Sequence, residues 1–228
     1  MDARILRGVA ALVVLALAGL TLLIASRGSA LGDDLSLDSP LISPKERAAG
    51  ASYDPGVPPA DRAWIDAALV AARPEAQRLI AEVDGLVRYE IHNGAPLGVT
   101  RSEISPLHAT FTLSFDVGAL DGDRAQDRAV TVLHEYGHVV DLALVPKELG
   151  DRLEAAIPRT GPCVDYDGIS RGSCAVQAER FADTFAKWAL RGAVSLNGAG
   201  YGLASPASLE DWGAPLGRLA IQIDVATS

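Results

Sequence analysis

Two short helices are the first elements that the hydrophobic pattern predicts in the chain. A helical period starts at Pro59, and Pro74 starts or kinks a second helix that runs to about Val83. One face of the first helix collects the apolar side chains of Trp64, Ala67, Ala68 and Ala71. We therefore expect the folded part of the chain to begin with two consecutive helices.

Three segments of β type follow, at residues 86–92, 97–104 and 109–118. The dipeptide Asn93-Gly94 lies between the first two segments, and it favours a tight hairpin turn. The sequence thus predicts a small sheet in which the first two strands form a hairpin.

Helical periodicity returns in two further segments, after Asp123 and after Cys174. The first of these helices has a buried stripe made of Ala129, Val132, Leu133, Tyr136 and Val140. Gly192 marks the end of the second helix. The core stripe of this second helix consists of Ala178, Phe181, Ala182, Phe185 and Ala189. Together with the strands, these helices predict an α+β fold.

The length and composition of the chain are those of one domain with a substantial core. The 228 residues are 49% hydrophobic, which suffices for a domain of about 150 to 200 residues. We place this domain at residues 59–228. The formal net charge is −9, with 20 Lys and Arg against 29 Asp and Glu, so nucleic acid is not an expected partner.

The first 58 residues have a different pattern from the domain. Residues 8–26 are uncharged and about as long as the ~20 residues that cross a bilayer as a helix. Residues 1–30 are therefore read as an uncleaved single-pass anchor, or as a signal peptide cut after Ala30 and leaving a secreted protein. In both cases the domain is expected outside the cytoplasm; a buried core helix is the third alternative. Residues 31–58 mix Asp, Ser, Pro and Gly without a sustained period, which predicts a linker.

The sequence HEYGH places His134 and His138 four residues apart on a predicted helix. Residues i and i+4 share one helix face, so both imidazoles can reach one ion while Glu135 stands beside them. Zn²⁺ accepts nitrogen ligands of this kind. An ordinary helix surface is the alternative, but the chain has only four histidines, and His92 and His108 lie in β-type or loop segments. The spacing therefore favours a metal site.

A catalytic zinc site needs a third protein ligand and keeps one position open for water. Glu179 and Asp183 lie one turn apart beside the apolar stripe of the later helix, where a carboxylate pair is costly to bury without partners. We expect Glu179 to bind the metal and Asp183 to orient a ligand histidine through its second ring nitrogen. A solvated pair of acids on an exposed edge is the alternative.

Two short motifs, HEYGH at residues 134–138 and ERFAD at residues 179–183, resemble the HExxH plus ExxA[DE] pattern of gluzincin metallopeptidases. The longer wording, HEYGHVVD with ERFADTF, is similar to the anthrax lethal factor-like peptidases. The resemblance implies a minimal zincin fold, in which a small twisted sheet lies over a metal-binding helix and a C-terminal helical part follows. The site residues that it implies are the zinc ligands His134, His138 and Glu179, the general base Glu135 and the supporting acid Asp183.

The resemblance further implies a tyrosine that stabilises the oxyanion and an edge strand that pairs with an extended peptide. Gly172 stands seven residues before Glu179, where the family pattern has its tyrosine. Tyr166 and Tyr201 are the substitutes that we consider, against the alternative that each is a loop or packing residue. The strand expected to pair with the peptide is ATFTLSF, residues 109–115.

Cys163 and Cys174 are the only cysteines of the chain, and both lie between the two metal-site helices. Outside the cytoplasm, such a pair favours a disulfide. Additional zinc ligands are the alternative, but two histidines and a glutamate already complete a catalytic set, and a fourth protein ligand would close it.

These features predict a zinc-dependent peptidase that hydrolyses a protein or peptide substrate outside the cytoplasm. Contact with a membrane is expected through residues 8–26. The alternative is a non-catalytic binding or scaffold module that keeps zinc for stability. Glu135 favours the enzyme, because a structural site has no use for a carboxylate next to its ligands.

Overall fold

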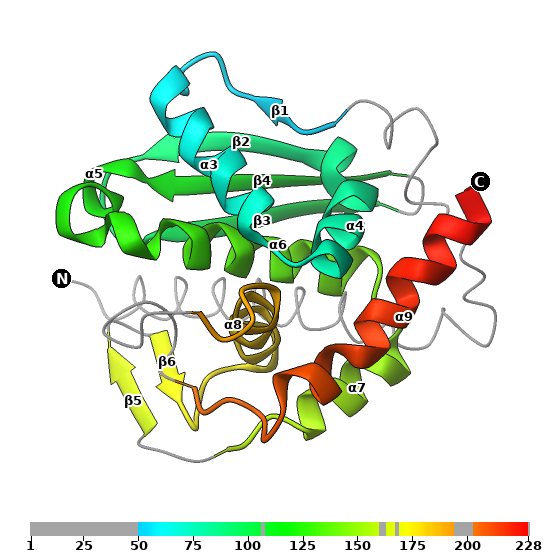
Figure 1. The fold of residues 1–228 in the computed structure, drawn as a ribbon. Helices are drawn as coiled ribbons and strands as arrows, with labels where there is room; N and C mark the ends of the chain where they lie inside the picture. The colour runs from blue at the N-terminus through cyan, green and yellow to red at the C-terminus, as the bar shows by residue number, and fades with distance from the viewer. Residues whose placement is uncertain (1–49, 106–107, 160–162, 167–168, 194–202, 228) are drawn as a thin grey trace, which may run out of the picture. The chain divides into compact units, whose positions relative to one another are not determined.

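The computed structural model of the chain describes residues 50–105, 108–159, 163–166, 169–193 and 203–227. Only the backbone is described for residues 164–166, 169 and 224–227. The described residues form a four-stranded sheet, a two-stranded hairpin and the helices that surround them (Figure 1). The α+β class expected from the sequence is thereby confirmed.

The main sheet is mixed and has the strand order β1-β2-β4-β3. Its strands are β1 (Ser52–Tyr53), β2 (Val87–His92), β3 (Gly98–Ser105) and β4 (His108–Asp116). Strands β1, β2 and β4 are parallel, whereas β3 runs antiparallel to β4 and forms one edge. The interior strand β4 buries the side chains of Ala109, Phe111, Leu113 and Phe115.

The hairpin expected around Asn93-Gly94 is wrong, because β4 lies between β2 and β3. His92 holds the segment that connects β2 to β3. Its ring nitrogens lie 2.8 Å from Ser114 Oγ on β4 and 2.9 Å from the carbonyl oxygen of Pro96 in that segment. Burial decides strand order as strongly as a turn signal does. The more apolar β4 therefore takes the interior position, and β3 forms its hairpin with β4 instead.

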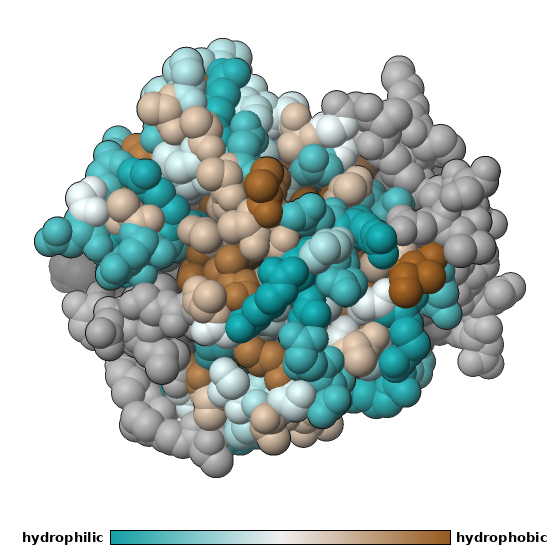
Figure 2. All heavy atoms as spheres, viewed as in Figure 1, coloured by the Kyte–Doolittle hydropathy of each residue, from teal (hydrophilic) through white to brown (hydrophobic). Residues whose placement is uncertain are grey.

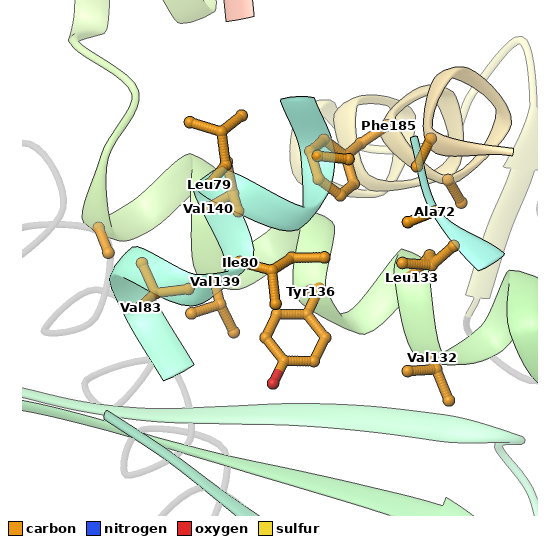
Figure 3. Close-up of a cluster of buried hydrophobic side chains, with 14 of the residues drawn as sticks. Ala72, Leu79, Ile80, Val83, Val132, Leu133, Tyr136, Val139, Val140 and Phe185 are labelled. Atoms are coloured by element: carbon orange, nitrogen blue, oxygen red, sulfur yellow. The ribbon is translucent and has the colours of Figure 1, made fainter. Parts of the chain in front are cut away.

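Three helices pack with the sheet around the main core. They are α3 (Pro59–Ala71), α4 (Pro74–Val83) and α6 (Arg128–Ala143). Helix α6 contacts α3, α4 and β3, and Figure 3 shows how its apolar side chains meet those of neighbouring elements. The labelled residues of this cluster are Ala72, Leu79, Ile80, Val83, Val132, Leu133, Tyr136, Val139, Val140 and Phe185. The stripe expected on α6 is thus the face that enters the core.

The face predicted for α3 is only partly correct. Ile65 and Ala68 are buried and Trp64 is half-buried, but Ala67 and Ala71 are exposed. Burial of a large aliphatic side chain contributes far more free energy than burial of an alanine. Ile65 therefore decides which face of α3 turns inward.

The folded domain begins before residue 59. Strand β1 pairs with β2, Val57 is 2% exposed, and Arg88 on β2 forms an ion pair with Asp54. The linker expected at residues 31–58 therefore overlaps the start of the domain. Strand β1 has only two residues, too few to produce a β pattern within this polar segment.

Helices dominate the part of the chain after α6. The elements there are α7 (Lys147–Ala155), β5 (Cys163–Tyr166), β6 (Ile169–Gly172), α8 (Gln177–Ala189) and α9 (Leu209–Thr227). Three shorter helices connect earlier elements, namely η1 (Asp84–Leu86), α5 (Val117–Leu120) and η2 (Gly122–Asp127). Of the longer helices after α6, only α8 was expected. Pro215 lies inside α9 and weakens the helical signal of its sequence. The buried residues of α9 nevertheless recur at helical spacing, as Trp212, Leu216, Leu219, Ala220 and Ile223.

Hydrophilic and hydrophobic residues are interspersed on the face of the molecule that Figure 2 displays. The large apolar side chains that are most exposed among the described residues are Val70, Leu142, Val176 and Ile221. They belong to separate elements, and Leu142 is the one among them that lines the cleft described below.

The expected disulfide is confirmed, since Cys163 and Cys174 are joined with a Cα–Cα distance of 5.1 Å. The bond closes the hairpin of β5 and β6 just before α8 begins. Neither thiol is therefore left to bind a metal ion, which excludes the two cysteines as additional ligands.

The expected location, a single-pass membrane anchor with the domain outside the cytoplasm, requires correction. Across residues 50–227, as far as they are described, no helix combines the length and the apolar character needed to cross a membrane. Residues 8–26, on which the expectation was based, lie outside the described residues.

Removing the disulfide should weaken the fold. The bond links residues 11 positions apart, and a loop of that length predicts a loss of about 2 to 3 kcal/mol in the free energy of unfolding. Urea unfolding of the Cys163→Ser, Cys174→Ser double variant beside the oxidised wild type measures this loss. Equal unfolding midpoints would contradict the prediction, and reduced wild-type protein serves as the control for the substitutions themselves.

Candidate metal centre

Two histidine rings lie close together on α6. His134 and His138 are one helical turn apart, and their ring centroids are separated by 4.9 Å. His134 is 7% exposed and His138 is half-buried, so both are largely shielded while still facing a cleft. The spacing of the sequence therefore does place the two imidazoles on one face.

Tyr136, between the two histidines in sequence, anchors α6 to the sheet. Its hydroxyl donates a hydrogen bond to Asp84 and lies 2.5 Å from the hydroxyl of Tyr89 on β2. Burial raises the pKa of Tyr136 well above its usual value, so the phenol stays neutral. One face of α6 is thereby fixed against the sheet, and the histidines are turned to the cleft.

Glu179, in the first turn of α8, completes the cluster. Its Oε2 lies 3.0 Å from His134 Nε2 and 3.4 Å from His138 Nε2. One possible ligand atom from each of these three residues lies within 4.8 Å of the other two. Two imidazole nitrogens and a carboxylate oxygen at such distances are able to hold a metal ion.

Glycine at position 137 permits the close approach of α6 and α8. A Cβ at Gly137 would lie 2.7 Å from the Cα and 3.1 Å from the Cβ of Ala182. Gly137 belongs to the turn between His134 and His138, and Ala182 belongs to the turn that follows Glu179. The three ligand groups therefore meet because two small residues let the helix backbones touch.

The electrostatics of the cluster favour a negative Glu179 beside the two histidines. Burial alone would raise the pKa of Glu179, but the hydrogen bonds and charges of His134 and His138 outweigh it and lower this pKa well below its usual range. Burial would lower the pKa of His134, but Glu179, Glu135 and Asp183 together raise it. An ionised carboxylate among imidazoles is suited to receive a cation.

A cleft of about 320 Å³ opens beside the cluster. One wall is β3 with the turn before it, and the other wall is formed by α6 and the start of α8. The lining residues are Pro96, Gly98, Val99, Thr100, Ser102, His134, Glu135, His138, Leu142, Ala178 and Glu179. None of these lining residues is a lysine or arginine.

Glu135 lies in this cleft but outside the ligand cluster. It is 4% exposed and turns toward β3, where the Thr100 hydroxyl donates a hydrogen bond of 2.7 Å to Glu135 Oε2. A carboxylate beside the ligand cluster, yet held by a different element, is available for proton transfer.

Asp183 lies one turn after Glu179 and is 2% exposed. Its carboxylate forms an ion pair of 2.6 Å with Lys187, whose ammonium group also donates to the carbonyl oxygen of Leu203. Its charge also contributes to the raised pKa of His134. The solvated edge considered for this acid is therefore excluded, and its role in orienting His134 stays a prediction.

Gly172 occupies the position at which a tyrosine was expected, and its backbone conformation favours glycine. Gly172 ends β6 with φ +64°, in the left-handed region that side chains rarely adopt. The side chain of Tyr166 and the whole of Tyr201 lie outside the described residues, so neither substitute is placed near the cluster.

The strand expected to bind an extended peptide requires correction. Residues 109–115 belong to β4, which is paired on both sides and has no free edge. Strand β3, from Gly98 to Ser105, is the edge strand, and it lines the cleft. The strand that immediately precedes the metal-site helix in sequence is therefore not the one next to it in space.

Three residues of the site were not found from the sequence, namely Gly98, Thr100 and Gly137. Gly137 does have a signal, since it is a glycine in the middle of a strongly helical stretch. Glycine there lowers helix stability by about 1 kcal/mol relative to alanine, so its presence suggests a need for close packing. No comparable signal marks Gly98 or Thr100, since their importance depends on which strand lies at the edge.

Comparison of the chain with protein-family models, with curated proteins and with solved structures finds no match.

Replacing Gly137 by alanine should force α6 and α8 apart. The added methyl group would meet the backbone of Ala182 and should cost about 1 to 3 kcal/mol of stability, as overpacking usually does. Because the same spacing places Glu179 near the histidines, metal affinity should also fall. Urea unfolding of the metal-free protein and competition with a zinc chelator measure the two effects.

Gly213→Ala is the matched control for this substitution. A Cβ at Gly213 would clash with the indole of Trp188, near the end of α8 distant from Glu179. This variant should lose stability but keep its metal affinity. An unchanged affinity in Gly137→Ala, or equal losses of affinity in both variants, would contradict the proposed role of the helix spacing.

Proposed function

We propose that the protein is a zinc-dependent peptidase of the gluzincin type. The observation that carries the proposal is that the polar side chains around α6 form two separate groups. His134, His138 and Glu179 converge on one point, while Glu135 lies in the same cleft and is held by β3. This arrangement supports hydrolysis better than it supports a purely structural metal site.

Zinc fits the donor set best among common metal ions. Imidazole and carboxylate groups suit it, and three protein ligands leave a position open for water. A zinc ion held there would lower the pKa of its bound water toward ~7 and polarise the carbonyl group of a substrate. The cleft beside the cluster provides room for that substrate.

Glu135 is the residue proposed to move the proton. Its carboxylate accepts a proton from the attacking water and delivers it to the leaving nitrogen. The oxygen of that water forms a bond with the acyl carbon as the carbon–nitrogen bond breaks, so the products are a carboxylic acid and an amine. The near-complete burial of Glu135 keeps competing bulk water away from this transfer.

Strand β3 is proposed to bind the peptide main chain. The amide of Asp116 donates to the carbonyl oxygen of Leu97 at 2.9 Å, so position 97 is directed toward β4. Inward and outward positions alternate along an antiparallel strand, so Gly98, Thr100 and Ser102 direct their amide and carbonyl groups outward. All three line the cleft, and an extended peptide can add there as a further strand.

The competing function is a non-catalytic module that binds zinc for stability. It shares the three ligands with the peptidase but assigns no role to Glu135 or to the cleft. The two functions are therefore separated by variants that keep the ligands and change Glu135.

Glu135→Gln should lower activity strongly and leave zinc binding intact. The substitution removes the general base, which typically costs 10² to 10⁴ in rate, or about 3 to 5 kcal/mol of activation free energy. His134→Ala, His138→Ala and Glu179→Ala should lose zinc and activity together. Zinc content by mass spectrometry and cleavage of a diverse peptide library are the measurements.

A wild-type protein that binds one zinc ion but cleaves no peptide in the library would contradict the proposed function. Glu135→Gln would then be indistinguishable from it in every assay. The non-catalytic zinc module would take the place of the peptidase.

Asp183→Asn should lower zinc affinity by about 10- to 100-fold, the usual effect of losing an acid that orients a ligand histidine. The matched control is Asp151→Asn on α7. Asp151 forms an ion pair of the same length with a lysine at the same helical spacing, 2.6 Å from Lys147, but it is exposed and does not line the cleft. Chelator competition should show a change for Asp183 alone, and equal affinities in both variants would exclude a role for Asp183 at the site.

A further inference from the structure

The carboxylate of Glu135 is enclosed by two residues of β3. Thr100 donates its hydroxyl hydrogen bond to Glu135 Oε2 at 2.7 Å, and the same hydroxyl lies 3.2 Å from the main-chain carbonyl oxygen of Glu135. This contact joins an edge strand to the helix that carries the histidines. It is a bond between positions 35 residues apart, so local sequence does not dictate it.

Gly98 provides the space that the carboxylate occupies. A Cβ at Gly98 would lie 2.4 Å from Glu135 Oε1 and 2.9 Å from Glu135 Cδ, closer than real contacts allow. Any side chain at this position would therefore displace Glu135. The hydroxyl of Thr100 binds one carboxylate oxygen of Glu135, and the backbone of Gly98 leaves space for the other oxygen. Together these two residues define a single position for the carboxylate.

A fixed carboxylate has a direct chemical advantage in proton transfer. A glutamate side chain has several rotatable bonds, and a general base acts only within hydrogen-bond reach of the proton that it removes. A hydrogen bond to an ionised acceptor is stronger than one between neutral groups, so it can select one side-chain conformation. Holding a reacting group in place can remove a large part of an activation barrier.

We propose that Thr100 is a positioning residue for Glu135, and that β3 thereby sets the base relative to the peptide bound along its edge. The inference rests on the proposed peptidase function. Thr100 acts through its side chain on Glu135, and its outward main-chain groups lie where the peptide would pair. The substrate-binding strand and the base are therefore parts of one rigid unit.

Thr100→Val tests the proposal, because it removes the hydroxyl and keeps the shape of the side chain. We expect kcat to fall by about 10- to 100-fold, as for loss of a hydrogen bond to a charged group, with KM and zinc content close to wild type. Thr100→Ser keeps a hydroxyl and should restore kcat to within a few-fold of wild type. Thr112→Val, a half-buried threonine of β4, is the matched control and should leave kcat unchanged.

The Glu135→Gln background separates positioning from a general structural effect. If Thr100 acts through the base, adding Thr100→Val to Glu135→Gln should lower kcat no further. Gly98→Ala is the second variant, since it keeps the hydroxyl but displaces the carboxylate. It should also lower kcat without loss of zinc.

A measurement on the metal-free protein tests the contact without any activity. The changes in unfolding midpoint caused by Thr100→Val and Glu135→Ala should be non-additive, because each removes the same hydrogen bond. Additive changes would overturn the contact on which the proposal depends.

The outcomes distinguish this inference from the proposed function. An active wild type with a strongly impaired Glu135→Gln and a fully active Thr100→Val overturns the positioning role alone. An equal further loss in the Glu135→Gln background, or loss of zinc from Thr100→Val, also overturns it in favour of a structural role. A zinc-loaded wild type that cleaves no peptide overturns both proposals.

Discussion

The close packing of α6 against α8 is the constraint on which the candidate site depends. His134 and His138 share a helix face by virtue of their spacing, but a third ligand must come from another element. That element reaches them only because Gly137 and Ala182 leave no side-chain bulk between the two backbones. The ligand separations of 3.0 and 3.4 Å follow from this helix spacing. One helix contact therefore affects both the stability of the fold and the geometry of the candidate ligands, which explains why a helix-weakening glycine stands between His134 and His138.

The other face of α6 supplies the rigidity that the cleft needs. Tyr136 ties the helix to β2 and to Asp84, and the neighbouring apolar side chains fill the core shown in Figure 3. Because α6 is fixed on that side, the position of Glu135 relative to β3 is also fixed. The Thr100 hydrogen bond then holds the acid at an edge strand whose outward main-chain groups are directed into the cleft. Helix α6 thus determines where the candidate ligands, the proposed base and the edge strand β3 lie relative to one another.

Much of the site was predictable from sequence because it depends on local spacing, whereas its surroundings depend on the order of strands. The i, i+4 pair of histidines, the acids of α8 and the disulfide could all be inferred from short-range pattern and residue type. The pairing of β2 with β4, in place of a hairpin at Asn93-Gly94, could not be inferred, because the apolar character of β4 overrides a turn signal. The same exchange of strands moved the expected peptide-binding edge from residues 109–115 to β3 and concealed Thr100 and Gly98. The positive φ of Gly172 could likewise not be inferred from the sequence, so nothing indicated that a tyrosine at this position would be strained.

X-ray absorption at the zinc edge, on protein loaded with one equivalent of zinc, identifies the ligand atoms of the proposed site. We expect two nitrogen ligands at about 2.0 to 2.1 Å with oxygen ligands at about 2.0 to 2.2 Å, from the two imidazoles, the carboxylate and water. Glu179→Ala should change this spectrum, and Glu135→Gln should not. A sulfur ligand at about 2.3 Å, a shell made only of oxygen, or a spectrum unaffected by Glu179→Ala would contradict the site as described.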